Sequence, residues 1–451
     1  MLPIVGLFCE CCAVSACKKC CRLIDRRLKC KQIAWPENKP FYHQWVNVGS
    51  AQASVDLGSG FISEDRLKRF FCSWCHRTKV DILDNIGINL ESCDFQKYKN
   101  IIIPPTCVQL DKGSVAAIKP PTNKDWEPLI VFANRKSGSY KGDEVLSLFR
   151  GVLNPIQVID ISRTPPEGVV RWLPRRCRVL AAGGDGTVAW ILNALRNAPH
   201  TRAGVAILPM GTGNDLSRVL GWGATCSSNL DVNSIIHDVT QAEEQYLDTW
   251  TVSITSPRSR LVGGGGRSLF AHNYVSLGVD AQVALDFHRA RRAFLYRYAN
   301  RTLNYIAYAF LGANRAFDDG GCQGLEQRLR VRLDDNPPLE LPPIQALVLL
   351  NIPSWGAGVD LWSMGDEEVG EQSICDGKME VAGVSSSFHI ARLQCGLAEP
   401  YRFGQASKIT IELSGSCAMQ VDGEPWLQRA ATIHLARAGA SRVLAAIQPH
   451  E

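Results

Sequence analysis

Short apolar runs alternate with amphipathic segments through the middle of the chain. The segments that follow the runs, such as EVLSLFRGVL and TVAWILNALRNA, have the periodicity of helices. Buried strands that alternate with helices indicate a parallel sheet covered on both faces, so we expect a three-layer α/β lobe. The predicted strands, each followed by a polar or glycine-bearing loop, are PLIVFAN (128–134), NPIQVIDI (154–161), CRVLAAGG (177–184) and AGVAILPMGTGNDL (203–216).

The pattern changes after the glycine run GGGGR at 263–267. Apolar and polar residues alternate with period two in RLRVRLDD (328–335) and KITIELSG (408–415), and Asp-Gly turns follow in later segments. This half predicts a mainly antiparallel, β-sandwich-like second lobe.

Residues 287–312 predict a helix with aromatic and basic residues. Two arrangements fit that composition: core packing with a solvated arginine face, and a membrane interface.

The N-terminal region is rich in cysteine. Of the 17 cysteines, 11 lie at or before Cys107, several with C-x-x-C spacing. In a reducing compartment such spacing favours metal binding over disulfide formation, so residues 1–105 predict small modules that are stabilised by zinc. The stretch that ends with PPTN at 120–123 is typical of a linker.

Composition and charge narrow the class of protein. The 451 residues predict two or three domains, and 45% hydrophobic residues suffice for a core. The net charge of +5 does not indicate nucleic acid but suits an anionic lipid surface or a phosphorylated ligand. The apolar start lacks a basic leader and cleavage site, and no apolar run nears the ~20 residues of a membrane span. We expect a cytoplasmic protein with peripheral membrane association.

Three loops follow the predicted strands and carry glycine or small polar residues. Glycine lets backbone N–H groups approach phosphate oxygens, and a helix start adds its positive end. The alternative is that these glycines only permit tight turns and bind no phosphate. Asp185 would repel bound phosphates unless Mg²⁺ intervenes, or it would contact a substrate hydroxyl. The candidate phosphate-binding residues are Asn134, Ser137 and Gly138; Gly183, Gly184, Asp185, Gly186 and Thr187; and Gly211, Thr212, Gly213, Asn214 and Asp215.

Four motifs resemble those of diacylglycerol kinases. They are GGDGT (183–187), PMGTGNDLSRVLGWG (209–223), NYVSLGVDA (273–281) and QVDGEPW (420–426), and the likeness spans about residues 126–440. Two cysteine-rich modules that lead into the catalytic region make the epsilon type the nearest expected match, without its usual N-terminal apolar segment. The resemblance implies a truncated zinc module at 1–35, a degenerate one at 40–96, a linker at 97–125, a catalytic domain at 126–258 and an accessory domain at 268–440.

The resemblance implies an ATP- and Mg²⁺-dependent kinase that converts 1,2-diacylglycerol to phosphatidate, which attenuates diacylglycerol signalling and feeds phosphatidylinositol resynthesis. Asp422 would be the catalytic base, with Glu424 in reserve; a plain hairpin turn at Asp422-Gly423 is the alternative. Asp376 resembles an acidic turn that binds Mg²⁺. Asp280 would meet the glycerol head group or make a structural hydrogen bond. A kinase for another lipid alcohol and an inactive lipid-signalling scaffold are the rival functions.

The family pattern also implies a zinc site in the second module. His43, Cys72, Cys75 and Cys93 would form one Cys₃His site, whereas the cysteines of the module's other site are missing. A module too altered to bind metal is the alternative. In the first stretch Cys9, Cys12 and Cys30 lack a histidine, and Cys17 stands in its usual place. Expected partners are membrane diacylglycerol and an anionic lipid surface, with no nucleic acid; the oligomeric state is not predicted.

Overall fold

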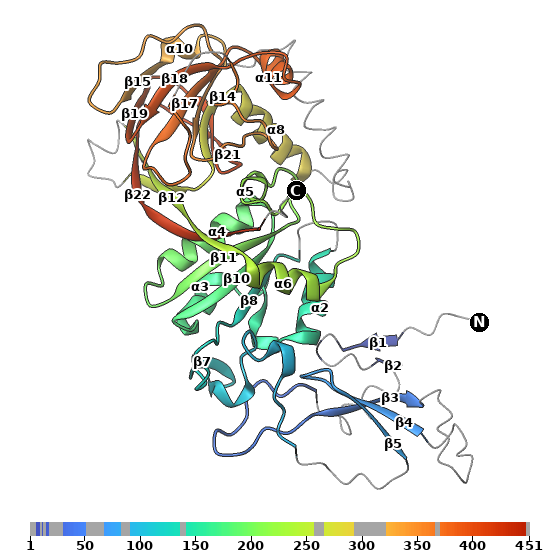
Figure 1. Ribbon diagram of the computed structural model, residues 1–451. Helices are drawn as coiled ribbons and strands as arrows, with labels where there is room; N and C mark the ends of the chain where they lie inside the picture. Colours follow the sequence, from blue (N-terminus) through green and yellow to red (C-terminus); the bar gives the residue numbers. More distant parts are fainter. Residues whose placement is uncertain are drawn as a thin grey trace, which may run out of the picture. The chain divides into compact units, whose positions relative to one another are not determined.

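Contacts between Cα atoms divide the chain into two compact units. The first comprises Met1–Arg135, Gly142–Leu180 and Ala198–Ala203, and the second comprises Lys136–Lys141, Ala181–Asn197 and Gly204–Glu451. The computed structural model describes residues 6–9, 11, 15–17, 30–50, 67–82, 91–135, 141–256, 266–292, 322–365 and 370–447 (Figure 1).

The cysteine-rich part of the first unit is built on a small antiparallel sheet. Its strands are β3 (Trp45–Ser50), β4 (Leu67–Cys72) and β5 (Thr78–Ile82), drawn in blue in Figure 1. The turn after β4 places Trp74 in the interior, where its ring meets those of Phe41 and Phe95 edge-on. This aromatic cluster supplies the core that so short a sheet needs. Earlier in the chain, β1 (Gly6–Phe8) and β2 (Ser15–Cys17) form a separate antiparallel pair.

Residues 97–125, for which the sequence predicts a linker, are folded into the first unit. Ile101, Ile102 and Ile103 are buried, and the amide side chain of Gln157 bonds to their backbone: it accepts from Ile103 N at 2.7 Å and donates to Ile101 O at 2.9 Å. Apolar isoleucines and a paired buried amide explain why this segment packs rather than stays extended. Its elements are η2 (Gln96–Tyr98), η3 (Pro105–Cys107), β6 (Val108–Asp111) and β7 (Ser114–Ile118).

The α/β part of the first unit follows the predicted alternation. The fully buried strand β8 (Leu129–Ala133) runs parallel to β9 (Val158–Asp160), and helix α2 (Lys141–Val152) lies between them in sequence. Further along come η4 (Pro155–Gln157), α3 (Pro166–Val169), η5 (Val170–Trp172) and the first residues of β10 (Arg176–Gly183) and β11 (Arg202–Pro209).

The sheet of the α/β half is mixed, which corrects the expectation of a parallel sheet. In the second unit the end of β11 pairs in parallel with β22 (Ala431–Ala445), and β22 pairs antiparallel with β12 (Glu243–Thr255), which pairs antiparallel with β13 (Arg267–Ala271). The C-terminal strand thus returns beside β11, a long-range pairing that local patterns do not reveal. The helices of this part are α4 (Asp185–Arg196), α5 (Asp215–Val219) and α6 (Val232–Gln241).

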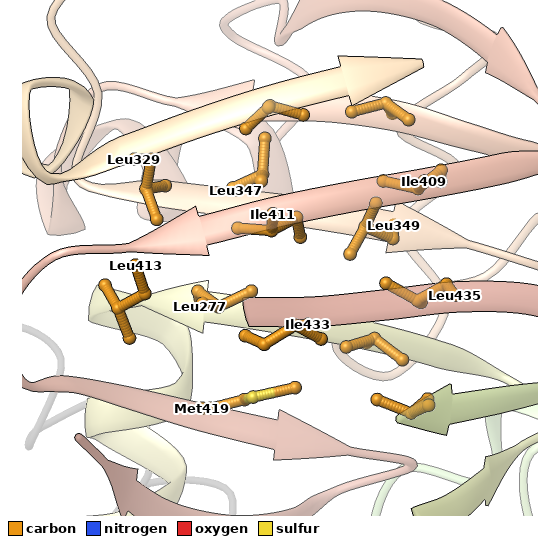
Figure 2. Close-up of a cluster of buried hydrophobic side chains, with 14 of the residues drawn as sticks. Leu277, Leu329, Leu347, Leu349, Ile409, Ile411, Leu413, Met419, Ile433 and Leu435 are labelled. Atoms are coloured by element: carbon orange, nitrogen blue, oxygen red, sulfur yellow. The ribbon is translucent and has the colours of Figure 1, made fainter. Parts of the chain in front are cut away.

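The rest of the second unit is a β-sandwich. One sheet is antiparallel, in the order β18-β17-β16-β14-β20-β21, and the facing layer comes from β15, β19, β22 and β12. Leucine, isoleucine and methionine side chains from both sheets interdigitate between them, as Figure 2 shows. The strands are β14 (Tyr274–Gly278), β15 (Leu329–Leu333), β16 (Ala346–Leu350), β17 (Met379–Val384), β18 (Tyr401–Ala406), β19 (Lys408–Leu413), β20 (Cys417–Val421) and β21 (Glu424–Gln428).

Three helices accompany the sandwich: α8 (Val279–Arg292), α10 (Leu325–Arg328) and α11 (Ser387–Gln394). The helix predicted over 287–312 coincides with α8 as far as Arg292, and residues 293–312 lie outside the described residues. Among the described helices, none combines the length and the apolar character that a membrane crossing requires.

Candidate functional site

The GGDGT segment connects β10 to α4. Gly184 is the last extended residue, and Asp185 opens the helix, whose first turn closes with Thr187 N donating to Gly184 O at 2.9 Å. A Cβ on Gly183 would lie 2.5 Å from the buried Thr187 side chain. Thr187 therefore packs on the backbone of Gly183, and Asp185 is left at the positive end of a 12-residue helix.

The GTGND segment is shaped by its own asparagine. The Asn214 side chain accepts from Gly211 N at 3.0 Å and donates to Gly211 O at 3.1 Å and to Ala224 O at 2.8 Å. Asn214 has a left-handed backbone (φ 53°). These bonds use the amide within the loop, so Asn214 determines the loop's shape.

The two glycine segments touch each other. A Cβ on Gly211 would lie 2.5 Å from the Cα of Gly184, and a Cβ on Gly184 would lie 2.8 Å from the Cα of Gly211. Met210 N also donates to Gly183 O at 2.9 Å. Glycine is required at both positions because the two backbones lie directly on each other. This requirement arises from the contact between the loops and not from the turn within either loop.

Asp185 is the point where several chain segments meet. Its carboxylate accepts from Asp215 N and Leu216 N, each at 3.2 Å, and from the Asn273 side chain at 3.1 Å. Burial, and then the negative charges of Asp215 and Asp422, raise the pKa of Asp185 to about 6. The site therefore contains a carboxyl group that titrates near neutral pH.

Asp215 is turned toward a different loop. One of its oxygens accepts from the Ser354 hydroxyl at 2.6 Å and from the N–H groups of Ala357 and Gly358 at 3.1 Å. Burial raises the pKa of this carboxyl, and the three donors oppose the shift. Asp215 thus links the GTGND segment to residues 354–358.

Asp422 forms the hairpin turn that the sequence offered as one of its two readings, and its role as a base stays a prediction. It lies in the two-residue turn between β20 and β21, where Asp422 and Gly423 both have positive φ, the geometry of a type I′ hairpin. Its carboxylate also accepts from three successive backbone N–H groups, those of His272 (2.8 Å), Asn273 (2.7 Å) and Tyr274 (3.1 Å).

Asn273 and His272 were not singled out as site residues from the sequence. Asn273 connects the carboxylates, because its backbone donates to Asp422 and its side chain donates to Asp185. His272 is 1% exposed, and neither ring nitrogen has a hydrogen-bond partner among the described residues; its Nδ1 lies 3.5 Å from an Asp422 oxygen. Asn273 opens the NYVSLGVDA motif and His272 directly precedes it, which was the available signal.

Glu424 differs from the buried carboxylates. It is exposed, and one of its oxygens would lie 3.3 Å from a Cβ on Gly186. Gly213 comes close as well, since its Cβ would lie 3.4 Å from an Asp185 oxygen, and Thr212 beside it is half-buried. Most of the predicted residues of the second unit therefore gather around the start of α4.

Asp280 and Asp376 are held in other surroundings. Asp280 is buried and accepts from the Ser276 hydroxyl at 2.5 Å and the Gln420 amide at 2.9 Å, and burial raises its pKa. The exposed Asp376 caps its own turn through Lys378 N. It belongs to no group of three potential metal ligands among the described residues, so its Mg²⁺ role stays a prediction.

The first predicted loop follows β8 in the first unit. Asn134 is described there, whereas Ser137 and Gly138 lie outside the described residues. A Cβ on Gly142 would lie 2.6 Å from Asn134 O, so the first turn of α2 packs closely on this residue.

The cysteine-rich part brings the four predicted ligands together. His43, Cys72, Cys75 and Cys93 are all buried, and their ligand atoms lie within 4.8 Å of one another. Proton sharing among the thiols lowers the pKa of Cys72 and raises the pKa of Cys75 and Cys93. A second group joins Cys9 and Cys30 with Cys11; the expected Cys12 lies outside the described residues.

Comparisons with known proteins identify the family of this chain. Residues 128–244 match the diacylglycerol kinase catalytic domain and residues 270–425 match the diacylglycerol kinase accessory domain. The chain belongs to the diacylglycerol kinase family. The expected likeness to the epsilon type is not tested by these matches and stays a prediction.

Relatives extend over most of the chain. Diacylglycerol kinase theta of Rattus norvegicus is 38% identical over 67% of this chain and 33% of its own length. Probable diacylglycerol kinase 3 of Caenorhabditis elegans is 28% identical over 99% of this chain and 61% of its own length. The chain therefore spans only part of these relatives. A solved diacylglycerol kinase from Bacillus anthracis str. Sterne is similar with a TM-score of 0.42 and 14% identity, covering 71% of this chain and 97% of that one.

The contact between the glycine segments predicts a steric effect. Gly211→Ala should push the two backbones apart and lower the free energy of unfolding by ~1–3 kcal/mol, as overpacking does. Urea unfolding measures this. Gly168→Ala is the matched control, because a Cβ there meets no atom within 4 Å. Equal stability of the two variants would contradict the contact.

The pKa of Asp185 predicts a pH effect on stability. The fold favours the protonated carboxyl, so its contribution is fully present below about pH 4 and is lost as the pH rises through about 6. Without added metal, Asp185→Asn should therefore show a smaller loss of stability between pH 4.5 and 7.5 than the unchanged protein. Unfolding midpoints test this, with the exposed Asp376→Asn as control. Parallel pH profiles for all three proteins would refute the assignment.

Proposed function

We propose that this chain is an ATP-dependent lipid kinase that transfers the γ-phosphoryl group of ATP to the free hydroxyl of 1,2-diacylglycerol. The observation that carries the proposal is the position of Asp185 at the start of α4, beside the GTGND segment and joined to Asp422 through Asn273. The products would be phosphatidate and ADP, so the reaction would attenuate diacylglycerol signalling and feed phosphatidylinositol resynthesis.

The phosphate groups of ATP would lie along residues 183–187 and 211–215. The start of α4 at Asp185 would present N–H groups and the positive end of the helix to an anion. Asp185 fits a divalent cation, because burial and two neighbouring carboxylates disfavour its negative charge unless a positive charge compensates. Mg²⁺, when bound, supplies that charge and neutralises the phosphates. Asp185 would hold it.

Asp422 is the proposed proton acceptor for the lipid hydroxyl. One of its oxygens accepts two backbone N–H groups and the other accepts one, so an acceptor position remains on the oxygen nearest His272. A base held by three backbone donors keeps a fixed orientation, which general-base catalysis requires. In the reaction the hydroxyl oxygen forms a bond to the γ-phosphorus, the bond to the β-phosphate oxygen breaks, and the hydroxyl proton passes to Asp422.

Glu424 is the second candidate for the same step. Its side chain makes no hydrogen bond to the described residues and lies beside Gly186 at the surface, where a lipid head group has access. The diacylglycerol would come from a membrane, so we propose peripheral association with an anionic lipid surface. Of the two roles expected for Asp280, contact with the glycerol head group and a structural hydrogen bond, the bonds from Ser276 and Gln420 favour the structural one.

A lipid panel tests the function. Labelled ATP with Mg²⁺ and vesicles that contain diacylglycerol, monoacylglycerol, ceramide or sphingosine should yield labelled phosphatidate as the main product. Asp422→Asn should lower turnover by ~10²–10⁴ while the thermal shift on adding MgATP persists. The exposed Asp335→Asn is the control. Labelling of another lipid alcohol would change the substrate, and no labelling at all would favour the inactive scaffold.

A comparison of two variants assigns the base. If Asp422 accepts the proton, Glu424→Gln should retain most of the turnover that Asp422→Asn loses. The reverse order would transfer the role to Glu424.

We further propose that His43, Cys72, Cys75 and Cys93 bind a structural zinc ion. Three thiols and one imidazole within 4.8 Å match the tetrahedral ligand set of zinc, and His43 Nε2 is buried without a partner among the described residues. Zinc, when bound, would replace the shared protons and hold the turn around Trp74.

Metal analysis of the purified chain tests the zinc proposal. Zinc should co-purify with the protein and be lost in Cys93→Ser, whereas Cys395→Ser, an exposed cysteine elsewhere, should retain it. A folded protein without zinc would refute the proposal. Loss of zinc in Cys30→Ser would instead assign metal to the Cys9, Cys11 and Cys30 group.

A further inference from the structure

Lys31 is a buried charge that neither the nucleotide site nor the zinc cluster uses. Its side chain is 6% exposed, and its Nζ donates to three backbone oxygens: Arg150 O at 2.9 Å, Gly151 O at 2.6 Å and Leu153 O at 3.1 Å. These carbonyls belong to the last turn of α2 and the residue that follows it. The final carbonyls of a helix have no partner within the helix, and this end carries a partial negative charge. One ammonium group therefore both pairs with the carbonyls and compensates the charge.

The cysteine-rich part determines where Lys31 lies. Nζ is 5.1 Å from the ring centre of Trp74, a cation–π contact with a ring that is 0% exposed. Trp74 lies between Cys72 and Cys75 in the chain, so the turn that carries two of the four clustered ligands also presents this ring. From the same turn, His76 Nε2 forms a hydrogen bond with Gly151 O at 3.1 Å. Two side chains thus join the cluster to the end of α2.

The other end of α2 lies against a predicted nucleotide residue. A Cβ on Gly142 would be 2.6 Å from Asn134 O and 2.7 Å from Arg135 Cα, and Arg135 pairs with Asp143 in the first turn. A helix of 12 residues transmits displacement along its axis because its backbone is hydrogen-bonded throughout. A shift of its C-terminal end would therefore alter the packing at Asn134.

We propose that Lys31 is a positioning residue that ties the Cys₃His cluster to α2, so that the state of the cluster controls how firmly Asn134 is held for the nucleotide. The proposal rests on the proposed kinase function for its effect on ATP, but the link itself concerns only contacts within the first unit. The cysteine-rich part then acts as a built-in support of Asn134, and loss of its metal weakens ATP binding without any change in the lipid site.

Hydrogen exchange on the full chain tests the link. Lys31→Met keeps most of the side-chain volume and removes the charge and its donors. We expect amide exchange in the last turn of α2, around 149–153, to become on the order of tenfold faster, with no change in β16. Lys119→Met is the matched control, since Lys119 is an exposed lysine of the same unit that pairs with Glu37. Removal of zinc from the unchanged protein by a chelator should accelerate the same amides.

Enzyme kinetics distinguishes a positioning role of Lys31 from a general loss of protein stability. Lys31→Met should raise the KM for ATP several-fold and leave the KM for diacylglycerol unchanged, and Lys31→Arg should restore part of the ATP affinity. Unchanged exchange at 149–153 in Lys31→Met, or exchange equal to that of Lys119→Met, would overturn the proposal. If Lys31→Met does not fold, the chelation result decides the matter. A wild-type protein without kinase activity that still shows the exchange effect would refute the kinase function and keep the link.

Discussion

One residue, Asn273, connects two carboxylates of the candidate site through hydrogen bonds. Its backbone donates to Asp422 and its side chain donates to Asp185, so two carboxylates that are more than 200 residues apart share one partner. Buried carboxylates repel each other unless donors or a cation compensate their charges. Here the compensation comes almost entirely from backbone N–H groups, which are fixed by the strands and helices that carry them. The position of each acidic group is therefore a property of the fold and not of a flexible side chain.

The sequence predicted those parts of the site that depend on local chemistry. The strand–glycine–helix order at 177–190 and the Asp-Gly turn at 422–423 follow from short patterns, and the structure has the corresponding arrangements. The group of His43, Cys72, Cys75 and Cys93 was implied by the family resemblance, and the four residues do lie together. The alternation of apolar residues likewise predicted the antiparallel sandwich.

The parts that could not be predicted depend on long-range contacts. The contact of Gly184 with Gly211 needs both backbones in place, and the bonds of Asp215 to residues 354–358 cross about 140 positions. Residues 97–125, for which a linker was expected, pack into the first unit for a related reason. The backbone groups of the buried isoleucines there pair with the side chain of Gln157, which comes from another segment. Single buried amides such as Asn154 and Gln157 leave no periodic signal in a sequence.

Strand β22 has a consequence for how the chain acquires its structure. Its 15 residues pair with β11 and β12 in one sheet region and with β19 in the sandwich, so both regions lack a central member until residues 431–445 have been made. During synthesis on the ribosome, the glycine segments with Asp185 and Asp215 emerge long before the strand that completes their support. The second unit must therefore mature late and nearly all at once, and its unpaired strand edges depend on protection from aggregation until then.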